Sequence, residues 1–186
     1  MNDASTTEPL EPARAARVTL AQITRGGDAN AFGTVHGGVL LRLADECGAV
    51  AALRHATSST GSRVKMITTA AIDAFTFLTP VGVGELLEVT AEVTRVGRSS
   101  IEARIEVHAE DLARRGRRLV AVGFGLFVAL DEHGAPAVAT PLRSETDADH
   151  ARDEAARRRQ AVRLSLREEA RALEPCDSGG ASSTHP

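Results

Sequence analysis

The chain has 186 residues, of which 42% are hydrophobic and 25% are charged, and this composition predicts one globular domain with tails. A formal net charge of −3 and the lack of Trp and Tyr argue against a nucleic-acid partner, which needs basic surface and aromatic stacking platforms. The chain contains no apolar run of the ~20 residues that a membrane helix needs and no signal-peptide pattern, so we predict a cytoplasmic protein without a membrane partner. Cys47 and Cys176 lack metal-site or disulfide spacing, and we expect both to stay unpaired.

The first predicted elements follow a polar arm, residues 1–16, which has no hydrophobic period and which we expect to be disordered. RVTLAQIT, from Arg17, alternates like a short strand. Residues 37–55 are predicted as a helix, because they are rich in Ala and Leu and contain no Pro. This helix is apolar almost all round, which indicates that it is buried at the centre of the domain.

Four long extended runs follow the helix: VKMITTAAIDAFTF, ELLEVTAEVTRV, SSIEARIEVHAED and RRLVAVGFGLFVALD. In the third run, apolar and charged residues alternate from Ile101 to Glu110, so we expect one face of the sheet to contact water. The connectors PVGVGE, RVGRSS and ARRG are short, which predicts that successive strands are antiparallel neighbours. The predicted architecture is an α+β fold in which a long antiparallel sheet wraps around one central helix.

The composition changes at residues 143–171, which carry many charges of both signs and neither Pro nor Gly. Pairs such as Asp153 with Arg157 have the i,i+4 spacing that supports a solvated helix. We therefore predict a charged C-terminal helix over 143–175, which lies on the surface or packs in an oligomer. The tail, 176–186, is expected to be disordered.

Asp45 is the unusual feature of the predicted central helix, because it lies in the most apolar part of the run. A buried carboxylate without a partner is costly, so such a group normally becomes protonated, pairs or serves a site. The residues that share its helix face are mostly small: Gly38, Leu41, Arg42, Gly48, Ala49 and Ala52. Small neighbours leave space for a ligand or for another element, while pairing with Arg42 in a core or an interface is the structural alternative.

The start of this helix, residues 34–38 (Thr-Val-His-Gly-Gly), leaves unpaired backbone N–H groups at the positive end of the helix dipole. Such a helix start can hold an oxyanion, and we expect Asp45, two turns further on, to face the same substrate atom. Asn30 in the preceding loop adds an amide. These donors and the carboxylate suit acyl transfer to water, although a Gly pair alone is also typical of a tight turn into a helix.

The pattern Asn-x-x-Gly-x-x-x-Gly-Gly, with an Asp seven residues after the second Gly, resembles the signature of hotdog-fold acyl-CoA thioesterases. DAFTFLTPVGVGELLEV, VGRSS and DEHGAPAVATP resemble later segments of the same family, so the resemblance covers roughly residues 17–142. The Arg-rich C-terminal helix is also similar to that of the acyl-CoA hydrolase branch. The resemblance implies a hotdog fold and hydrolysis of an acyl-CoA thioester to a carboxylic acid and CoA, a reaction of fatty acid metabolism, with no cofactor and no metal.

The resemblance also implies roles for individual residues. Asp45 matches the catalytic carboxylate, Asn30 an active-site Asn, and Gly37 the residue whose backbone N–H polarises the thioester carbonyl. Asp45 acts as general base or as nucleophile, and the sequence leaves both roles open. Further candidate substrate contacts are His36, Gly38, Thr69, Arg95, Arg98, Ser99 and Ser100.

These further candidates differ in chemistry. We interpret His36 as a turn or positioning residue, and Thr69 either as a water-orienting hydroxyl or as an ordinary strand residue. Residues 95–100 combine Arg and Ser side chains around a Gly in a turn, which suits contact with the phosphates of CoA. An exposed, Arg-rich turn is the structural alternative for that segment.

For assembly, the resemblance implies a homo-oligomer of dimers with active sites shared between two chains, arranged as a trimer of dimers, a hexamer. The open edges of a sheet of about five strands favour pairing as well, and we expect a long strand such as Ser99–Asp111 to continue the sheet across a two-fold axis.

Two other classes occur on the same fold. A hydratase or dehydratase needs a catalytic His paired with an acid, whereas His36 and Asp45 lie nine residues apart across the helix start. A non-catalytic acyl-CoA sensor loses the acid and adds a DNA-binding module, for which we find no room before Arg17.

Overall fold

The computed structural model describes residues 10–114 and 116–172, so residues 1–9 of the expected arm and the expected tail lie outside the described residues. Within it the chain forms β1 (Arg17–Ile23), α1 (Gly37–Ala56), β2 (Met66–Phe77), β3 (Leu86–Val96), β4 (Ser100–Asp111), β5 (Gly116–Leu130) and α2 (Asp147–Ala172). A short 3-10 helix, Gly26–Asp28, precedes α1. No helix in this part of the chain has the length and apolar character to cross a membrane.

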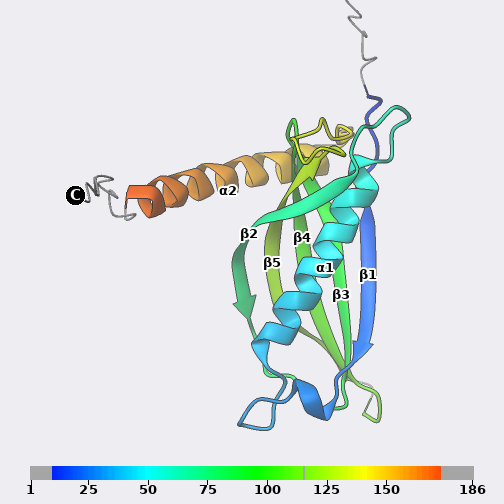
Figure 1. Ribbon diagram of the computed structural model, residues 1–186. Coiled ribbons are helices and arrows are strands. Elements are labelled where there is room, and N and C mark those ends of the chain that lie inside the picture. Colours follow the sequence, from blue (N-terminus) through cyan, green and yellow to red (C-terminus); the bar gives the residue numbers. More distant parts are fainter. Residues whose placement is uncertain (1–9, 115, 173–186) are drawn as a thin grey trace, which may run out of the picture.

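The five strands form one antiparallel sheet in the order β1-β3-β4-β5-β2. The sheet curves around α1, which lies along its inner face, while α2 lies across the other side (Figure 1). Half of α1 is buried against the sheet, including Cys47, which is free as expected. The predicted α+β architecture, a sheet wrapped around a central helix with a C-terminal helical extension, is thereby confirmed.

One expectation about the sheet is wrong, because the consecutive strands β2 and β3 are not neighbours. β2 pairs with β5 at the far edge, whereas β3 pairs with β1 and β4. The short connector, residues 78–85, crosses the end of the sheet, where Val35 N–H donates to Val81 O at 2.8 Å. The connector is short because it only has to pass beneath the start of α1, so its length carries no information about pairing.

The position of β4 corrects a second expectation. β4 lies at the centre of the sheet and is paired on both sides, with β3 and with β5. It therefore has no free edge with which to continue the sheet across a two-fold axis. The open edges belong to β1 and β2.

The bounds of the predicted tails also differ from the structure. Residues 10–16 were expected to be disordered, yet Ala13 N–H donates to Pro141 O at 2.9 Å, and Arg143 N–H donates to Ala13 O at 2.8 Å. The charged helix begins at Asp147 rather than at residue 143. It begins there because Asp149 N–H donates to Thr146 Oγ1 at 3.2 Å while the Asp149 carboxylate accepts from Thr146 N–H at 3.0 Å, which caps the helix.

Helix α1 approaches the sheet closely at Gly48. A Cβ atom at Gly48 would lie 2.5 Å from Cζ of Phe127, and one at Gly125 would lie 2.7 Å from the same atom. The fully buried ring of Phe127 therefore fits between two residues that have no side chain. Asp45 precedes Gly48 by three residues, so this contact sets how deeply its carboxylate lies against the sheet.

α2 crosses the outer face of the sheet and contacts the strands in their spatial order. Arg152 pairs with Glu92 of β3 at 3.1 Å, and Arg159 pairs with Glu102 of β4 at 2.6 Å. Arg159 also stacks on Phe124 of β5, 3.8 Å from the ring centroid. The crossing ends at β2, where Arg163 pairs with Asp73.

Glu102 is an exception to the expectation that this face of β4 contacts water, because α2 covers it and leaves the residue 3% exposed, whereas Arg104 on the same face is exposed. Its carboxylate accepts hydrogen bonds from Arg159, from Arg163 and from Thr94 Oγ1. Burial acts to raise the pKa of Glu102, but these hydrogen bonds outweigh it and hold the pKa below the usual range. The buried carboxylate is thus charged and is the centre of the contact that holds α2.

His55 is a buried titratable residue near the end of α1. Its ring is fully buried, and Nε2 lies 3.0 Å from Thr140 O. Burial lowers the pKa of His55 and outweighs the effect of this hydrogen bond. The folded protein therefore holds His55 neutral at pH values where an exposed imidazole is charged.

We expect the free energy of unfolding to fall as the pH drops below about 6.5, the ordinary pKa of histidine, because only the unfolded chain then binds a proton at His55. Above this pH both states are neutral and the effect vanishes. The variant His55→Gln keeps a donor for Thr140 O but cannot titrate, so its stability should decline less between about pH 7 and about pH 5. Urea unfolding at both pH values measures the difference. An unchanged decline would assign it to other groups, such as His108, whose pKa burial also lowers.

Candidate active site

The candidate site lies where α1 faces β2. Thr69 Oγ1 donates a hydrogen bond of 2.6 Å to Asp45 Oδ1, which joins the helix to the edge strand. Asp45 is half-buried and Thr69 is exposed, so the pair remains accessible to solvent. The structure thus brings together the predicted carboxylate and the predicted hydroxyl.

The structural alternative for Asp45, an ion pair with Arg42, does not form. Arg42 instead pairs with Glu46 at 2.8 Å and donates to Gln22 at 3.3 Å. Among the described residues no cation pairs with Asp45. A carboxylate that is oriented by a hydroxyl and has no cation partner is free to accept a proton or to attack an electrophile.

The start of α1 offers one free backbone donor rather than two. His36 is the N-cap residue, and its Nδ1 accepts a hydrogen bond of 2.9 Å from Gly38 N–H. Gly38 N–H is thus occupied within the chain, while the contact of Gly38 with substrate and the positioning role of His36 stay predictions. Gly37 N–H forms no hydrogen bond within the described part of the chain, and it remains available to a carbonyl oxygen.

An apolar cavity of about 330 Å³ lies beside Gly37. It is lined by Val35, Gly37, Leu40, Phe77, Leu78, Thr79, Pro80 and Val81. A Cβ atom at Gly37 would lie 3.2 Å from the ring of Phe77, so a larger residue would crowd the donor. Phe77 was not a predicted site residue; the alternation of Phe75 and Phe77 in the sequence was the available signal.

Gly37 and Asp45 do not meet at one atom within a single chain, which corrects the expectation that they do. They are eight residues apart on one helix and hence about 12 Å apart along its axis. Asp45 is also too far along α1 to share a small reacting group with the loop before it.

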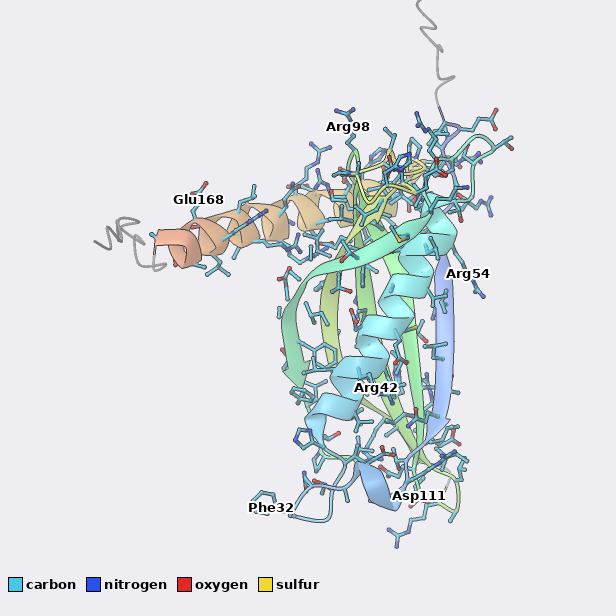
Figure 2. The ribbon with its side chains drawn as sticks, in the orientation of Figure 1. Phe32, Arg42, Arg54, Arg98, Asp111 and Glu168 are labelled. Carbon is cyan, nitrogen blue, oxygen red and sulfur yellow. The ribbon has the colours of Figure 1, made fainter. Side chains whose placement is uncertain are left out.

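Asn30 shapes the loop that precedes α1. Its Oδ1 accepts from Phe32 N–H at 2.9 Å and from Thr34 N–H at 3.2 Å, and its Nδ2 donates to Thr34 Oγ1 at 2.9 Å. Within the described residues it forms no hydrogen bond with Asp45. The loop presents Phe32, which is 91% exposed and points away from the rest of the chain (Figure 2).

The predicted CoA-binding turn lies at the other end of the sheet from Phe32 (Figure 2). Arg98 extends from its tip into solvent and has no ion-pair partner within the described part of the chain, whereas Arg95 pairs with Asp153 of α2 at 3.3 Å. Arg95 and Ser100 line a cavity of about 590 Å³ between the sheet and α2. Arg98 and Ser99 do not line it, so the structure separates the four predicted contacts.

Several known proteins are similar to this chain. Residues 32–115 match the family described as the thioesterase superfamily. The chain is 33% identical over 137 residues to an uncharacterized acyl-CoA thioester hydrolase of Zymomonas mobilis, a match that covers 73% of this chain and 85% of that protein. It is 35% identical over 102 residues to the cytosolic acyl coenzyme A thioester hydrolase of Mus musculus, covering 55% of this chain. That match spans 26% of the mouse protein, about a quarter of its length.

Solved structures are also similar. The acyl-CoA hydrolase of Staphylococcus aureus, in complex with butyryl coenzyme A and coenzyme A, has a TM-score of 0.72 and 28% identity, covering 84% of this chain and 91% of that chain. A hexameric acyl-CoA thioesterase has a TM-score of 0.70 and 30% identity, covering 84% of this chain and 94% of that chain. The Staphylococcus aureus enzyme has also been solved with an Asp, an Asn or a Thr replaced by Ala.

Proposed function

Since the chain belongs to the thioesterase superfamily and has its hotdog fold, we propose that it hydrolyses an acyl-CoA thioester to a carboxylic acid and free CoA. The observation that carries the proposal is the hydrogen bond of 2.6 Å between Thr69 and Asp45, an accessible carboxylate without a cation partner in the described part of the chain. The substrate class is supported by the CoA ligands of the Staphylococcus aureus relative. A cytoplasmic location and a place in fatty acid metabolism belong to the same proposal.

In the proposed reaction, Gly37 N–H donates to the thioester oxygen while Asp45 acts on the carbonyl carbon. As general base, Asp45 takes a proton from the attacking water; the C–S bond breaks, and the CoA thiolate leaves and is protonated. As nucleophile, Asp45 attacks the carbonyl carbon, the C–S bond breaks, and the CoA thiolate leaves and is protonated. Water then hydrolyses the mixed anhydride that remains, which releases the carboxylic acid and restores Asp45. Thr69 holds Oδ1 in either case, which leaves Oδ2 to act.

The test of this function is thiol release from a series of acyl-CoA substrates of increasing chain length, with the purified full-length chain. We expect release from at least one member of the series. A folded protein that releases thiol from none of them would overturn the proposal.

We further propose that the site is shared between two copies, with Gly37 and the Asn30 loop from one chain and Asp45 and Thr69 from the other. The axial separation of about 12 Å between Gly37 and Asp45 supports this, because one chain alone cannot place both on one thioester. Hexameric relatives support an assembly built on such pairs, and we propose a trimer of dimers.

Asn30→Ala should lower turnover by about 10- to 1000-fold, because the loop loses the three hydrogen bonds that shape it beside the proposed reacting carbonyl. When this variant is refolded together with Asp45→Ala, about a quarter of the wild-type activity should return, since half of the random dimers would contain one intact site of two. Thiol release by the mixture measures the recovery. Each variant refolded alone is the control, and no recovery in demonstrated mixed dimers would refute the shared site.

Arg98→Ala should raise the KM for acyl-CoA about tenfold, because a charged hydrogen bond to phosphate is lost. It should leave hydrolysis of a small N-acetylcysteamine thioester unchanged, since that substrate has no nucleotide. Steady-state kinetics on both substrates measure the effect, with Arg54→Ala, at an exposed arginine of α1, as the control. Equal losses on both substrates would assign Arg98 to structure rather than to recognition.

A further inference from the structure

The strand β2 contains one residue more than its partner strand near its end. Two of its residues, Ala74 and Phe75, lie opposite the single residue Gly123 of β5, which is a β-bulge. Ala74 has a φ of 46°, in the left-handed region, which residues with a side chain rarely adopt. This conformation is unfavourable, and it persists only because the surrounding structure holds it. Bulges of this kind re-aim the side chains that follow them.

The bulge decides on which face of the sheet Phe77 lies. Side chains alternate between the two faces of a strand, so one extra residue moves every later side chain to the opposite face. Asp73, just before the bulge, lies on the outer face, where it pairs with Arg163 of α2. In a regular strand, Phe77 would lie on the same face as Asp73. It lies instead on the inner face, where its ring packs beside Gly37 at the start of α1.

The ring of Phe77 is supported on one side and open on the other. Phe75 packs onto Gly123, where a Cβ atom would lie 2.6 Å from the Phe75 ring, so glycine leaves the room that this ring needs. The rings of Phe75 and Phe77 meet edge to face, with their centroids 5.2 Å apart. Phe77 nevertheless remains 50% exposed. A large apolar ring is therefore fixed in an accessible position beside Gly37, whose N–H is the proposed donor to the thioester.

Phe77 also forms a wall of the cavity of about 330 Å³ beside Gly37. The residues that line this cavity are apolar apart from Thr79, and Phe77 is the largest of them. Apolar walls favour a hydrocarbon, because binding removes the hydrocarbon from water. A thioester whose oxygen accepts from Gly37 N–H would bring its acyl chain to this cavity. The acyl chain is therefore the occupant whose chemistry matches the walls.

We propose that Phe77 sets the length of the acyl chain that the site accepts, and that the bulge at Ala74 places it there. The inference rests on the proposed hydrolysis, because it takes Gly37 N–H as the donor to the thioester oxygen. The acyl chain enters the cavity, and the ring of Phe77 limits how far it extends. Each methylene that the cavity buries should raise kcat/KM about fourfold, and the rise should stop where the chain meets the ring.

The first test measures kcat/KM of the full chain on saturated acyl-CoA substrates from acetyl-CoA to palmitoyl-CoA. In Phe77→Ala, the chain length at which kcat/KM stops rising should increase by about two to four carbons, because loss of the ring enlarges the cavity. Phe77→Trp should shorten this chain length. Phe124→Ala is the matched control, since it removes the same ring from the outer face of the sheet, and its length profile should equal that of the wild type.

Two variants of Ala74 test the bulge. Deletion of Ala74 removes the extra residue and returns Phe77 to the outer face, so the length profile should shift as in Phe77→Ala. Ala74→Gly keeps the bulge, because glycine adopts a positive φ without strain, and it should keep the wild-type profile. A folded deletion variant with the wild-type profile would refute the role of the bulge. The variants of Phe77 keep the bulge, so they test the specificity even if the deletion prevents folding.

The outcomes separate this inference from the proposed function, with thermal unfolding as the check that each variant is folded. Thiol release with an unchanged length profile in Phe77→Ala would overturn the inference while hydrolysis stands. An equal loss on every chain length would do the same, because it would assign Phe77 to structure. Thiol release from none of the substrates, by the folded wild-type protein, would overturn both.

Discussion

Asp45→Asn is expected to lower turnover by about 10²- to 10⁴-fold, the range for the loss of a general base. Asparagine has the shape of aspartate and still accepts the hydrogen bond from Thr69, which spans 2.6 Å in the native protein. Asparagine can neither take a proton from water nor form an anhydride. The variant therefore keeps the geometry of the site but loses both catalytic roles proposed for Asp45. Thiol release at saturating acyl-CoA measures the effect on turnover separately from binding.

The matched control for this variant is Glu46→Gln, one residue further along α1. Glu46 is exposed and pairs with Arg42 at 2.8 Å, and a surface pair of this kind contributes little. We expect its turnover to stay close to that of the wild type. Thermal unfolding of both variants checks the fold, and wild-type turnover in folded Asp45→Asn would end the proposed mechanism.

Glu102→Ala is expected to lower the free energy of unfolding by about 3 kcal/mol, because it strips Arg159 and Arg163 of their buried partner. We take the lower end of the range for a broken buried pair, since both guanidinium groups keep some contact with water. Urea unfolding at about pH 7 measures the loss. Glu154→Ala is the control, because Glu154 lies on α2 with Arg159 and Arg163, is exposed, and should change stability by less than about 0.5 kcal/mol.

The pH dependence of this contribution follows from the lowered pKa of Glu102. The folded protein keeps Glu102 charged at pH values where an exposed glutamate takes up a proton. Its contribution is therefore complete above about pH 4.3, the ordinary pKa of glutamate, and is lost as the pH falls toward the lower folded value. Glu102→Ala should narrow its gap from the wild type in acid, and a constant gap would contradict the assignment.

The sequence was sufficient to locate the elements of this fold. α1 and the strands β3, β4 and β5 begin and end close to their predicted bounds, because long periodic runs flanked by short turns are strong local signals. The pairing of β2 with β5 was not predictable in the same way. It depends on where α1 lies, and a helix's position is a tertiary property that local patterns do not contain.

The burial of Glu102 could not be predicted from the sequence, for a similar reason. Along β4 its charge marks it as an outward-facing residue, and it does face outward. What the strand pattern cannot reveal is that α2, more than forty residues later, covers that face with Arg159 and Arg163. Buried charges of this kind are found only when both partners are placed.

The candidate site was predicted in part. Asp45 stood out because it interrupts an apolar helix. For Thr69 two interpretations were open, a water-orienting hydroxyl or an ordinary strand residue, and the structure places this hydroxyl against the Asp45 carboxylate. The use of Gly38 N–H by the ring of His36 and the closeness of Phe77 to Gly37 both depend on side-chain geometry. The roles implied by the family resemblance remain predictions until the variants are measured.

The strand order also constrains how the chain can acquire its fold during synthesis. β3, β4 and β5 follow one another through short turns and can pair as soon as they emerge, so we expect them to form the first stable unit. α1 and β2 leave the ribosome earlier but must wait for β5, the strand that supplies the pairing for β2 and the ring of Phe127 for Gly48. During that interval the apolar surface of α1 is uncovered. A nascent chain that stalls before Gly116 should therefore be a substrate for chaperones and prone to aggregate.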